Sequence, residues 1–317
     1  MKKTPVTVLV LALTLALMSV AALGAPPTSE PKRVNKAIEL LERGQPIYYT
    51  TSRGGYEEGK KLAQTWADYI NYELEHGAFD MTRLREFMRG LVDGGPTPSG
   101  HRTPAVIATF PALGIDEASV RANHWMIQQV LAAGVHGVLM CHARTPGAAR
   151  AFVEATRYPF HKQEVGEGLQ EGLRGSGSQG YAAEIWGISG REYLEVADAW
   201  PLNPNGEILL GLKIEDRHAL QNAEATTRVP GIGFAEWGPG DMSFSYGVTR
   251  TADGYPEVML EARARVLAAT KAAHIVFLNG VNPDNVEAMI DQGVMMGPAS
   301  EEAAEKGRRY TKRAMPW

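Results

Sequence analysis

The sequence contains one cysteine in 317 residues, Cys141, so no disulfide can form within the chain. It also lacks an excess of basic residues. The 32 Lys and Arg face 36 Asp and Glu, and this net charge of −4 predicts no nucleic-acid partner. After residue 25 no apolar run is long enough to cross a membrane. A hydrophobic core must therefore hold the fold, and 44% hydrophobic residues are enough to form one.

The first 25 residues have the pattern of a secretory signal peptide. Lys2 and Lys3 precede an apolar run over residues 6–23, and small residues at 22, 24 and 25 offer a cleavage site. The alternative is an uncleaved anchor, because about 18 apolar residues are just enough to span a bilayer. We expect cleavage and a periplasmic or secreted protein without further membrane contact. Residues 26–34 then form a polar leader, and 35–317 form a single domain.

Short apolar runs rich in β-branched residues alternate with segments of helical period. The runs cover residues 46–52, 69–76, 105–111, 137–141, 208–215, 232–238, 275–279 and 294–297. The helical segments cover residues 56–66, 81–91, 117–133, 145–156, 219–228, 257–272, 285–291 and 301–313. Strands separated by helices pair in parallel, and eight such units predict a (β/α)8 TIM barrel rather than an open Rossmann-like sheet. The long Gly-rich stretch 160–183 is expected to be a lid or an active-site loop.

In a parallel barrel the active site lies at the carboxyl ends of the strands. Three ionisable residues take this position: His76 in YELEHG, Glu215 in GLKIED, and Asp241 in WGPGDMS. Two carboxylates without a converging Cys or pair of His favour a hard divalent ion, Mg²⁺ or Mn²⁺ first, with Co²⁺ or Zn²⁺ as alternatives. Taken singly, either carboxylate is more simply a solvated loop group, and Asp241 a helix cap. Their shared position favours a metal site.

Five segments resemble, in order, motifs of the HpcH/HpaI aldolase/citrate lyase family. They are YELEHGAFD, GVHGVLMCHARTPGAARAFVEATRYP, LRG, LKIEDRHAL and PGIGFAEWGPGDMS, and they lie within roughly residues 46–297. The resemblance implies a metal-dependent aldolase that acts on 2-oxo acids. It also implies a homo-oligomer, either a hexamer or a trimer, and a small carbonyl or carboxylate compound as the substrate.

The same resemblance implies a role for each site residue. Glu215 and Asp241 are the metal ligands, and His76 is the acid/base residue that moves the aldol hydroxyl proton. The backbone amides of Gly240 and Asp241 bind the substrate carboxylate at the start of a helix. Arg174, in the LRG motif, lies near the substrate entrance. The metal acts as a Lewis acid that stabilises the enolate left by carbon–carbon cleavage.

The sequence departs from the family pattern at charged positions. Ile107 stands where the family has an Arg that polarises the 2-oxo group, and Lys213 stands where it has a Gln. Lys213 shares strand parity with Glu215 and is therefore expected to face the barrel interior. We expect Lys213 either to supply the lost positive charge or to pair with Glu215. A Schiff-base role is disfavoured, because a neighbouring carboxylate raises the pKa of a lysine.

Cys141 and His142 end the fourth run, where the family usually has Pro and an apolar residue. A packed thiol and a partly buried imidazole are favoured here over a place in the pocket. The sequence as a whole predicts a metal-dependent carbon–carbon lyase for a hydroxylated 2-oxo acid or a related carbonyl compound. One alternative is an exported barrel that has lost aldol chemistry and only binds its ligand. Another keeps the metal but catalyses a different lyase or a hydrolase reaction.

Overall fold

A computed structural model describes residues 32–249, 251 and 254–316 of the chain. The signal peptide predicted for residues 1–25 lies outside this part, as does the polar leader up to residue 31. Among the helices within these ranges, none combines the length and the apolar character that a membrane span needs.

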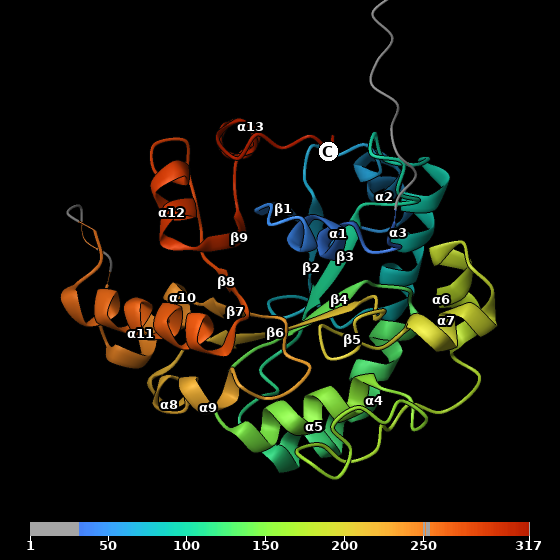
Figure 1. The fold of residues 1–317 in the computed structure, drawn as a ribbon, viewed down its shortest axis with the longest axis horizontal. Coiled ribbons are helices and arrows are strands. Elements are labelled where there is room, and N and C mark those ends of the chain that lie inside the picture. The colour runs from blue at the N-terminus through green and yellow to red at the C-terminus, as the bar shows by residue number, and fades with distance from the viewer. Residues whose placement is uncertain (1–31, 250, 252–253, 317) are drawn as a thin grey trace, which may run out of the picture.

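The centre of the molecule is a closed barrel of eight parallel strands, which confirms the predicted TIM barrel (Figure 1). Its strands follow the predicted apolar runs: β1 Ile47–Ser52, β2 Tyr69–Glu73, β3 Ala105–Thr109, β4 Gly137–Met140, β6 Ile208–Ile214, β7 Phe234–Trp237, β8 Val276–Leu278 and β9 Val294–Pro298. Each strand pairs with the next, and β9 closes the ring by pairing with β1. A strand of two residues, β5 Ala199–Trp200, pairs with the start of β6 outside the ring.

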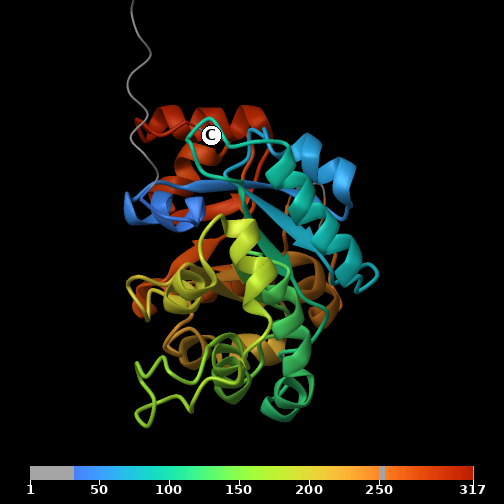
Figure 2. The ribbon, with the colours of Figure 1, turned by 90° about the vertical axis from the view of Figure 1, so that its right-hand side faces the viewer.

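Helices lie before, between and after the strands, and most of them form the outer layer (Figures 1 and 2). They are α1 Lys36–Glu42, α2 Tyr56–Leu62, α3 Met81–Asp93, α4 Glu117–Ala132, α5 Pro146–Thr156, α6 Gln179–Trp186, α7 Gly190–Val196, α8 Arg217–Gln221, α9 Ala223–Thr226, α10 Pro239–Tyr246, α11 Glu257–Ala273, α12 Val286–Gln292 and α13 Glu301–Tyr310. The single helix expected over residues 219–228 is in fact two short helices, α8 and α9, with Asn222 between them.

One end of the barrel is closed by α1, a helix that is not among the segments predicted from the sequence. Its apolar face, with Ile38 and Leu41, belongs to the same buried cluster as the inward-facing strand residues Ile47, Ile107 and Leu209. Asn35 caps this helix by accepting hydrogen bonds from the amides of its first turn. Because α1 precedes β1, it covers the amino ends of the strands. The carboxyl ends of the strands, at the opposite end of the barrel, are not covered by α1 and can form a functional site.

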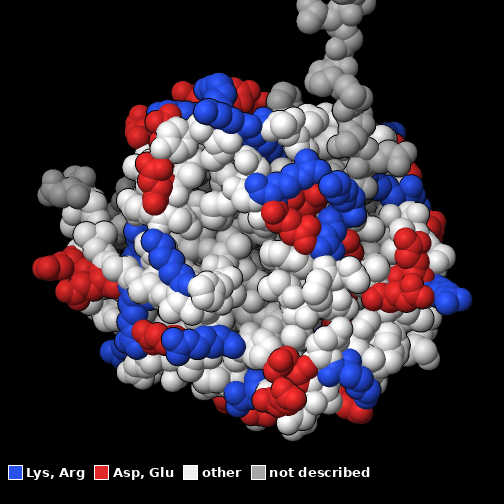
Figure 3. Space-filling model, in the orientation of Figure 1, with Lys and Arg blue, Asp and Glu red and all other residues white. Residues whose placement is uncertain are grey.

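The Gly-rich stretch 160–183 is irregular up to Ser178 and ends in the first residues of α6. Its backbone is bound to the end of α5. The amides of Leu173 and Arg174 donate hydrogen bonds to the backbone carbonyls of Glu154 and Arg157, respectively. On the face drawn in Figure 3, Lys and Arg side chains lie among Asp and Glu, and no continuous basic strip crosses it.

Candidate metal centre

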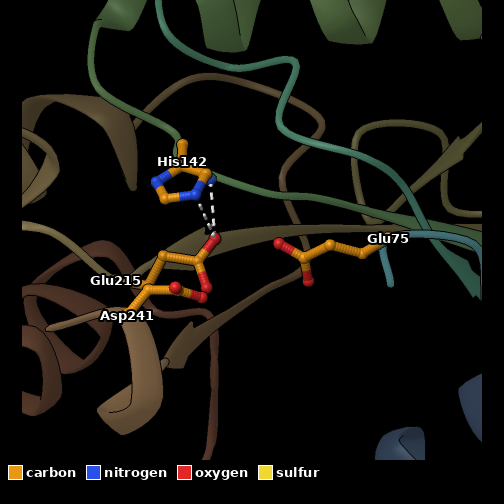
Figure 4. Close-up of side chains that lie close together, drawn as sticks. All are labelled: Glu75, His142, Glu215 and Asp241. Atoms are coloured by element: carbon orange, nitrogen blue, oxygen red, sulfur yellow. Dashed lines mark hydrogen bonds and ion pairs between the residues drawn. The ribbon is translucent and has the colours of Figure 1, made fainter. Parts of the chain in front are cut away.

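Four side chains converge at the carboxyl ends of the barrel strands (Figure 4). Glu75 follows β2, His142 follows β4, Glu215 follows β6, and Asp241 lies in the first turn of α10 after β7. One ligand atom from each residue lies within 4.8 Å of those of the others. Parallel strands bring these positions to one rim although they are up to 166 residues apart in sequence (241 − 75).

Glu215 is the innermost of the four and is completely buried. Its Oε1 accepts a hydrogen bond of 2.9 Å from the backbone amide of His142. Its Oε2 accepts no hydrogen bond within the described part of the chain, although the Lys213 ammonium lies 3.1 Å away. Gly238 makes room for this carboxylate, since a Cβ there would lie 2.6 Å from the Cβ of Glu215. The start of α10 therefore packs directly against the Glu215 side chain.

Asp241 and Gly240 stand in the first turn of α10, where backbone amides have no partner within the helix. The side chain of Asp241 points toward Glu215 in Figure 4. Gly240 is exposed, and a Cβ built on it would meet nothing within 4 Å. The space above this helix end is therefore open, and a negatively charged group could reach it.

Lys213 lies inside the barrel mouth, among carboxylates. Its Nζ is 2.7 Å from Glu75 Oε2 and 3.1 Å from Glu215 Oε2, and on the neighbouring strand it stands opposite Glu236. Burial lowers the pKa of Lys213, but the surrounding Cys141, Glu236, Glu215 and Glu75 outweigh it, and the net shift is upward. The amine therefore stays a cation, and this is the opposite of what a Schiff-base lysine needs.

Acidic groups outnumber cations at this rim. Burial raises the pKa of Glu215 to about 7, against the opposing charge of Lys213 and with help from Glu75. Burial likewise raises the pKa of Glu236 to about 8. One ammonium is thus too little positive charge for these carboxylates. A divalent cation would supply the remainder and keep them ionised.

The donor set fits a divalent metal ion. It comprises three carboxylates and one imidazole, and the buried Oε2 of Glu215 is free of hydrogen bonds. Oxygen ligands suit Mg²⁺ and Mn²⁺, and an added imidazole suits Mn²⁺, Co²⁺ and Zn²⁺. Glu215 and Asp241, the two ligands named from the sequence, lie together in this cluster. No sequence motif points to Glu75, and the sequence pattern favours a packed, partly buried imidazole for His142.

His76 lies on the same rim but outside the cluster. Its side chain is 57% exposed, and its Nδ1 is 3.5 Å from Glu73 Oε1 and 3.8 Å from Glu75 Oε2. Glu75 thus stands between His76 on one side and Lys213 on the other. The ring is open to solvent.

Arg174 lies in the outer helical layer, where it is 2% exposed. Its guanidinium is 4.3 Å from the ring centre of Tyr158, and its Nη2 donates to the Tyr193 hydroxyl at 3.0 Å. Neither Nε nor Nη1 has a hydrogen-bond partner among the described residues. The substrate-binding role predicted for Arg174 stays a prediction, since its side chain is buried against Tyr158 and Tyr193 and is not part of the carboxylate cluster.

Two cavities lie close to the cluster, although none of its four residues lines either of them. The first, of about 150 Å³, lies in the barrel interior and is lined by both Ile107 and Lys213, together with Asn71 and Thr109. The second, of about 760 Å³, lies between the ends of β7 to β9 and the helices α11 and α12. Glu236 lines both. Lys213 therefore shares a cavity with Ile107, the residue that the family resemblance places at the arginine position.

The sequence profile of the HpcH/HpaI aldolase/citrate lyase family matches residues 107–297 of this chain, which is more than half of it. The chain belongs to this family. The match runs from within β3 to within β9 and includes His142, Glu215 and Asp241. It leaves Glu75 and His76 outside its range.

Curated members of the HpcH/HpaI family share about a third of the aligned residues with this chain. A hydroxypyruvate/pyruvate aldolase from Cupriavidus necator is 34% identical over 190 residues, covering 58% of this chain and 63% of that protein. A 2-keto-3-deoxy-L-rhamnonate aldolase from Klebsiella pneumoniae is 33% identical over 194 residues, covering 58% and 64%. The chain thus spans a little under two thirds of the length of these relatives.

Solved structures extend the similarity in fold to nearly the whole chain. An HpcH/HpaI family protein from Burkholderia cenocepacia matches with a TM-score of 0.65 at 21% identity, covering 88% of this chain and 96% of that one. Macrophomate synthase matches with a TM-score of 0.62 at 20% identity, covering 86% of each chain. At these identities the likeness concerns the barrel alone.

Proposed function

We propose that this protein is a divalent-metal-dependent lyase that cleaves a carbon–carbon bond in a hydroxylated 2-oxo acid. The observation that carries the proposal is the convergence of Glu215 and Asp241 with Glu75 and His142 at the carboxyl ends of the strands. The names of two relatives, hydroxypyruvate/pyruvate aldolase and 2-keto-3-deoxy-L-rhamnonate aldolase, support this substrate class because each contains a 2-oxo acid.

The cleavage requires a proton to leave and negative charge to be stabilised. The hydroxyl group beside the breaking bond loses its proton, its carbon becomes an aldehyde, and the electron pair of the bond moves to the 2-oxo acid fragment. A divalent ion held by Glu215 and Asp241 would supply Lewis acidity for that negative charge. The backbone amides of Gly240 and Asp241 would bind the substrate carboxylate, which the positive end of α10 favours.

His76 would accept the hydroxyl proton. Its exposure leaves the ring accessible to a substrate, and Glu73 and Glu75 lie 3.5 and 3.8 Å from its Nδ1. Lys213 would add a fixed positive charge beside the 2-oxo group. Its place in one cavity with Ile107 supports a compensation for the missing arginine.

The size of the two cavities suits a small polar substrate. Asn71 and Thr109 give the inner cavity hydrogen-bonding groups for hydroxyls. The outer cavity, at about 760 Å³, falls within the ~300–1,000 Å³ range of typical ligand pockets. We propose Mg²⁺ or Mn²⁺ as the resident ion, with Co²⁺ or Zn²⁺ as alternatives.

Location and assembly are also part of the proposal. The pattern of residues 1–25 supports export to the periplasm or beyond, followed by cleavage of the signal peptide. A homo-oligomer is supported by the family resemblance and by Phe244 on α10, whose exposure of 80% leaves an apolar side chain in water. N-terminal sequencing and light scattering of the protein purified from its own cell test the two points.

A substrate panel tests the proposed activity. The protein is stripped with a chelator, reloaded with one divalent ion at a time, and incubated with hydroxylated 2-oxo acids of increasing length. Release of pyruvate or hydroxypyruvate is followed by a coupled reductase assay. The proposal requires release that depends on the added ion and is lost in Asp241→Ala. Release that persists in the stripped protein, or none from any acid with any ion, would contradict it.

A further inference from the structure

His142 adopts a backbone conformation that an L residue with a side chain rarely adopts. Its φ is +52°, in the left-handed region, which costs on the order of 1–3 kcal/mol and persists only where surrounding contacts hold it. This conformation turns both the amide and the ring of His142 toward one carboxylate. The amide donates to Glu215 Oε1 at 2.9 Å, and the ring lies above the same oxygen in Figure 4.

The far side of the ring is fixed by Asp216. The distance from His142 Nδ1 to Asp216 Oδ2 is 2.8 Å, and Arg144 Nε donates to the same oxygen at 2.9 Å. The other oxygen of Asp216 accepts from the backbone amides of His218 and Ala219. Since both oxygens are occupied as acceptors, the hydrogen of the His142–Asp216 contact belongs to Nδ1. Nε2 is then the ring nitrogen that Asp216 leaves unbound.

Nε2 is the ring nitrogen on the side of Glu215. It lies 3.8 Å from Glu215 Oε1, which is too long for a hydrogen bond. His142 and Glu215 each contribute one atom to the four candidate ligand atoms that lie within 4.8 Å of one another. Metal-binding histidines usually donate their other ring N–H to a carboxylate, and Asp216 holds Nδ1 of His142 in this way.

We propose that His142 is a ligand of the metal ion and binds it through Nε2, with Asp216 as the residue that positions the ring. The inference rests on the proposed metal site and adds a nitrogen donor to it. Mg²⁺ gains little from an imidazole, whereas Mn²⁺, Co²⁺ and Zn²⁺ accept one readily. The site should therefore favour these ions over Mg²⁺ more than a centre with oxygen ligands alone would.

Mn²⁺ itself is the probe for this ligand. Titration followed by the EPR signal of free Mn²⁺ gives the affinity, and pulsed EPR of bound Mn²⁺ detects a directly coordinated ¹⁴N nucleus. The wild-type protein is compared with His142→Ala, with Glu215→Ala, and with His76→Ala as the matched histidine control on the same rim. Asp216→Asn tests the positioning role, because it keeps the shape but changes the partner of Nδ1.

We expect one imidazole nitrogen coupled to Mn²⁺ in the wild-type protein and in His76→Ala, and none in His142→Ala. Loss of this ligand should weaken Mn²⁺ binding by about tenfold or more, the least that loss of a supporting residue costs in metal sites. Asp216→Asn should weaken binding while keeping the nitrogen coupling. Full Mn²⁺ binding without nitrogen coupling in wild type, or coupling that survives in His142→Ala, overturns the inference and leaves the metal site standing. A wild-type protein that binds no Mn²⁺, or Glu215→Ala that binds it undiminished, overturns both.

Discussion

The ammonium of Lys213 lies 3.1 Å from Oε2 of Glu215, and both groups are enclosed by the mouth of the barrel. Lys213 is 13% exposed and Glu215 is fully buried. The lysine therefore partly neutralises the carboxylate that binds a metal in the proposed site. A cation so placed competes with the metal for Glu215, and at the same time it offers positive charge to a substrate bound there.

Removal of the Lys213 charge should separate these two effects. Lys213→Met keeps the aliphatic stem, and we expect it to strengthen metal binding by about tenfold or more, because two like charges a few ångströms apart repel by a few kcal/mol at an effective dielectric of about 20. Turnover should fall, since Ile107 cannot replace the lost charge. Calorimetric metal titration and kcat measure the two changes.

The control for Lys213→Met is Lys162→Met, which removes an exposed ammonium paired with Glu171. Lys162→Met should change neither the metal affinity nor kcat. Weaker metal binding in Lys213→Met, with the protein folded, would contradict the competition. A substrate adduct trapped on Lys213 by borohydride would replace the electrostatic role with a Schiff base.

The two ligands named from the sequence can be tested without changing side-chain size. Glu215→Gln and Asp241→Asn should each abolish stoichiometric metal binding while circular dichroism and the melting temperature show a folded barrel. The physical reason is that a neutral amide oxygen is a much poorer ligand for a hard divalent ion than a carboxylate. Asp284→Asn, an exposed acid in the loop before α12, is the control and should bind metal as wild type does. Equal metal content in all four proteins would refute the assignment.

His76 should matter for turnover and not for the metal. His76→Ala is expected to keep its metal affinity and to lose about 10²–10⁴-fold in kcat, the usual contribution of a general acid or base. The comparison requires saturating substrate and a full metal load, so that only the proton transfer differs. A kcat within a few-fold of wild type would show that another group moves the proton.

Low pH should destabilise the barrel through His136, a buried histidine away from the site. Burial lowers the pKa of His136 to about 3, while its ring accepts a hydrogen bond from the Val106 amide and stacks on Trp186. Between pH 6.5 and 3 the unfolded chain therefore binds a proton that the folded protein excludes. The free energy of unfolding is greatest above the pKa that the histidine has in the unfolded chain, about 6.5, and it decreases as the pH falls. From pH 7 to 5 this residue alone should remove about 2 kcal/mol from the free energy of unfolding.

The matched pair for this effect is His136→Asn and His274→Asn. An Asn at position 136 keeps an acceptor for the Val106 amide but does not titrate. The free energy of unfolding should therefore fall by about 2 kcal/mol less between pH 7 and 5 than in the wild-type protein. His274 is exposed at the end of α11, and its replacement should leave the decline unchanged. Urea unfolding at the two pH values measures the slopes. Equal slopes in wild type and His136→Asn would contradict the account.

Much of the fold could be predicted from the sequence, because burial on both faces gives barrel strands continuous apolar runs. The eight runs correspond to the eight strands of the ring. The two-residue β5 gives too short a pattern to be seen, and α1 lies directly after the predicted leader, before the first of the alternating runs. The break between α8 and α9 depends on Asn222. Its side-chain amide donates a hydrogen bond to the backbone carbonyl of Arg144, which belongs to another βα unit. Such tertiary contacts leave no local signal.

The site could be predicted only in part, for a related reason. Glu215 and Asp241 stand at strand ends, which the barrel rule selects. Glu75 also lies near a strand end, but its neighbour His76 draws attention as the residue with a family role. The turn of His142 toward Glu215 depends on a left-handed backbone that the residue type does not favour. Its departure from the family's apolar residue was the only sequence signal for it.

Exchange of the methyl protons of pyruvate in heavy water is the most direct test of the central claim. It reports enolate formation at the site and requires no knowledge of the aldehyde partner. We predict that the metal-loaded wild-type protein catalyses this exchange, seen as loss of the methyl signal by proton NMR. A chelator or Asp241→Asn should abolish it. Exchange that persists without the metal, or its absence with every divalent ion, would contradict a metal-dependent aldolase.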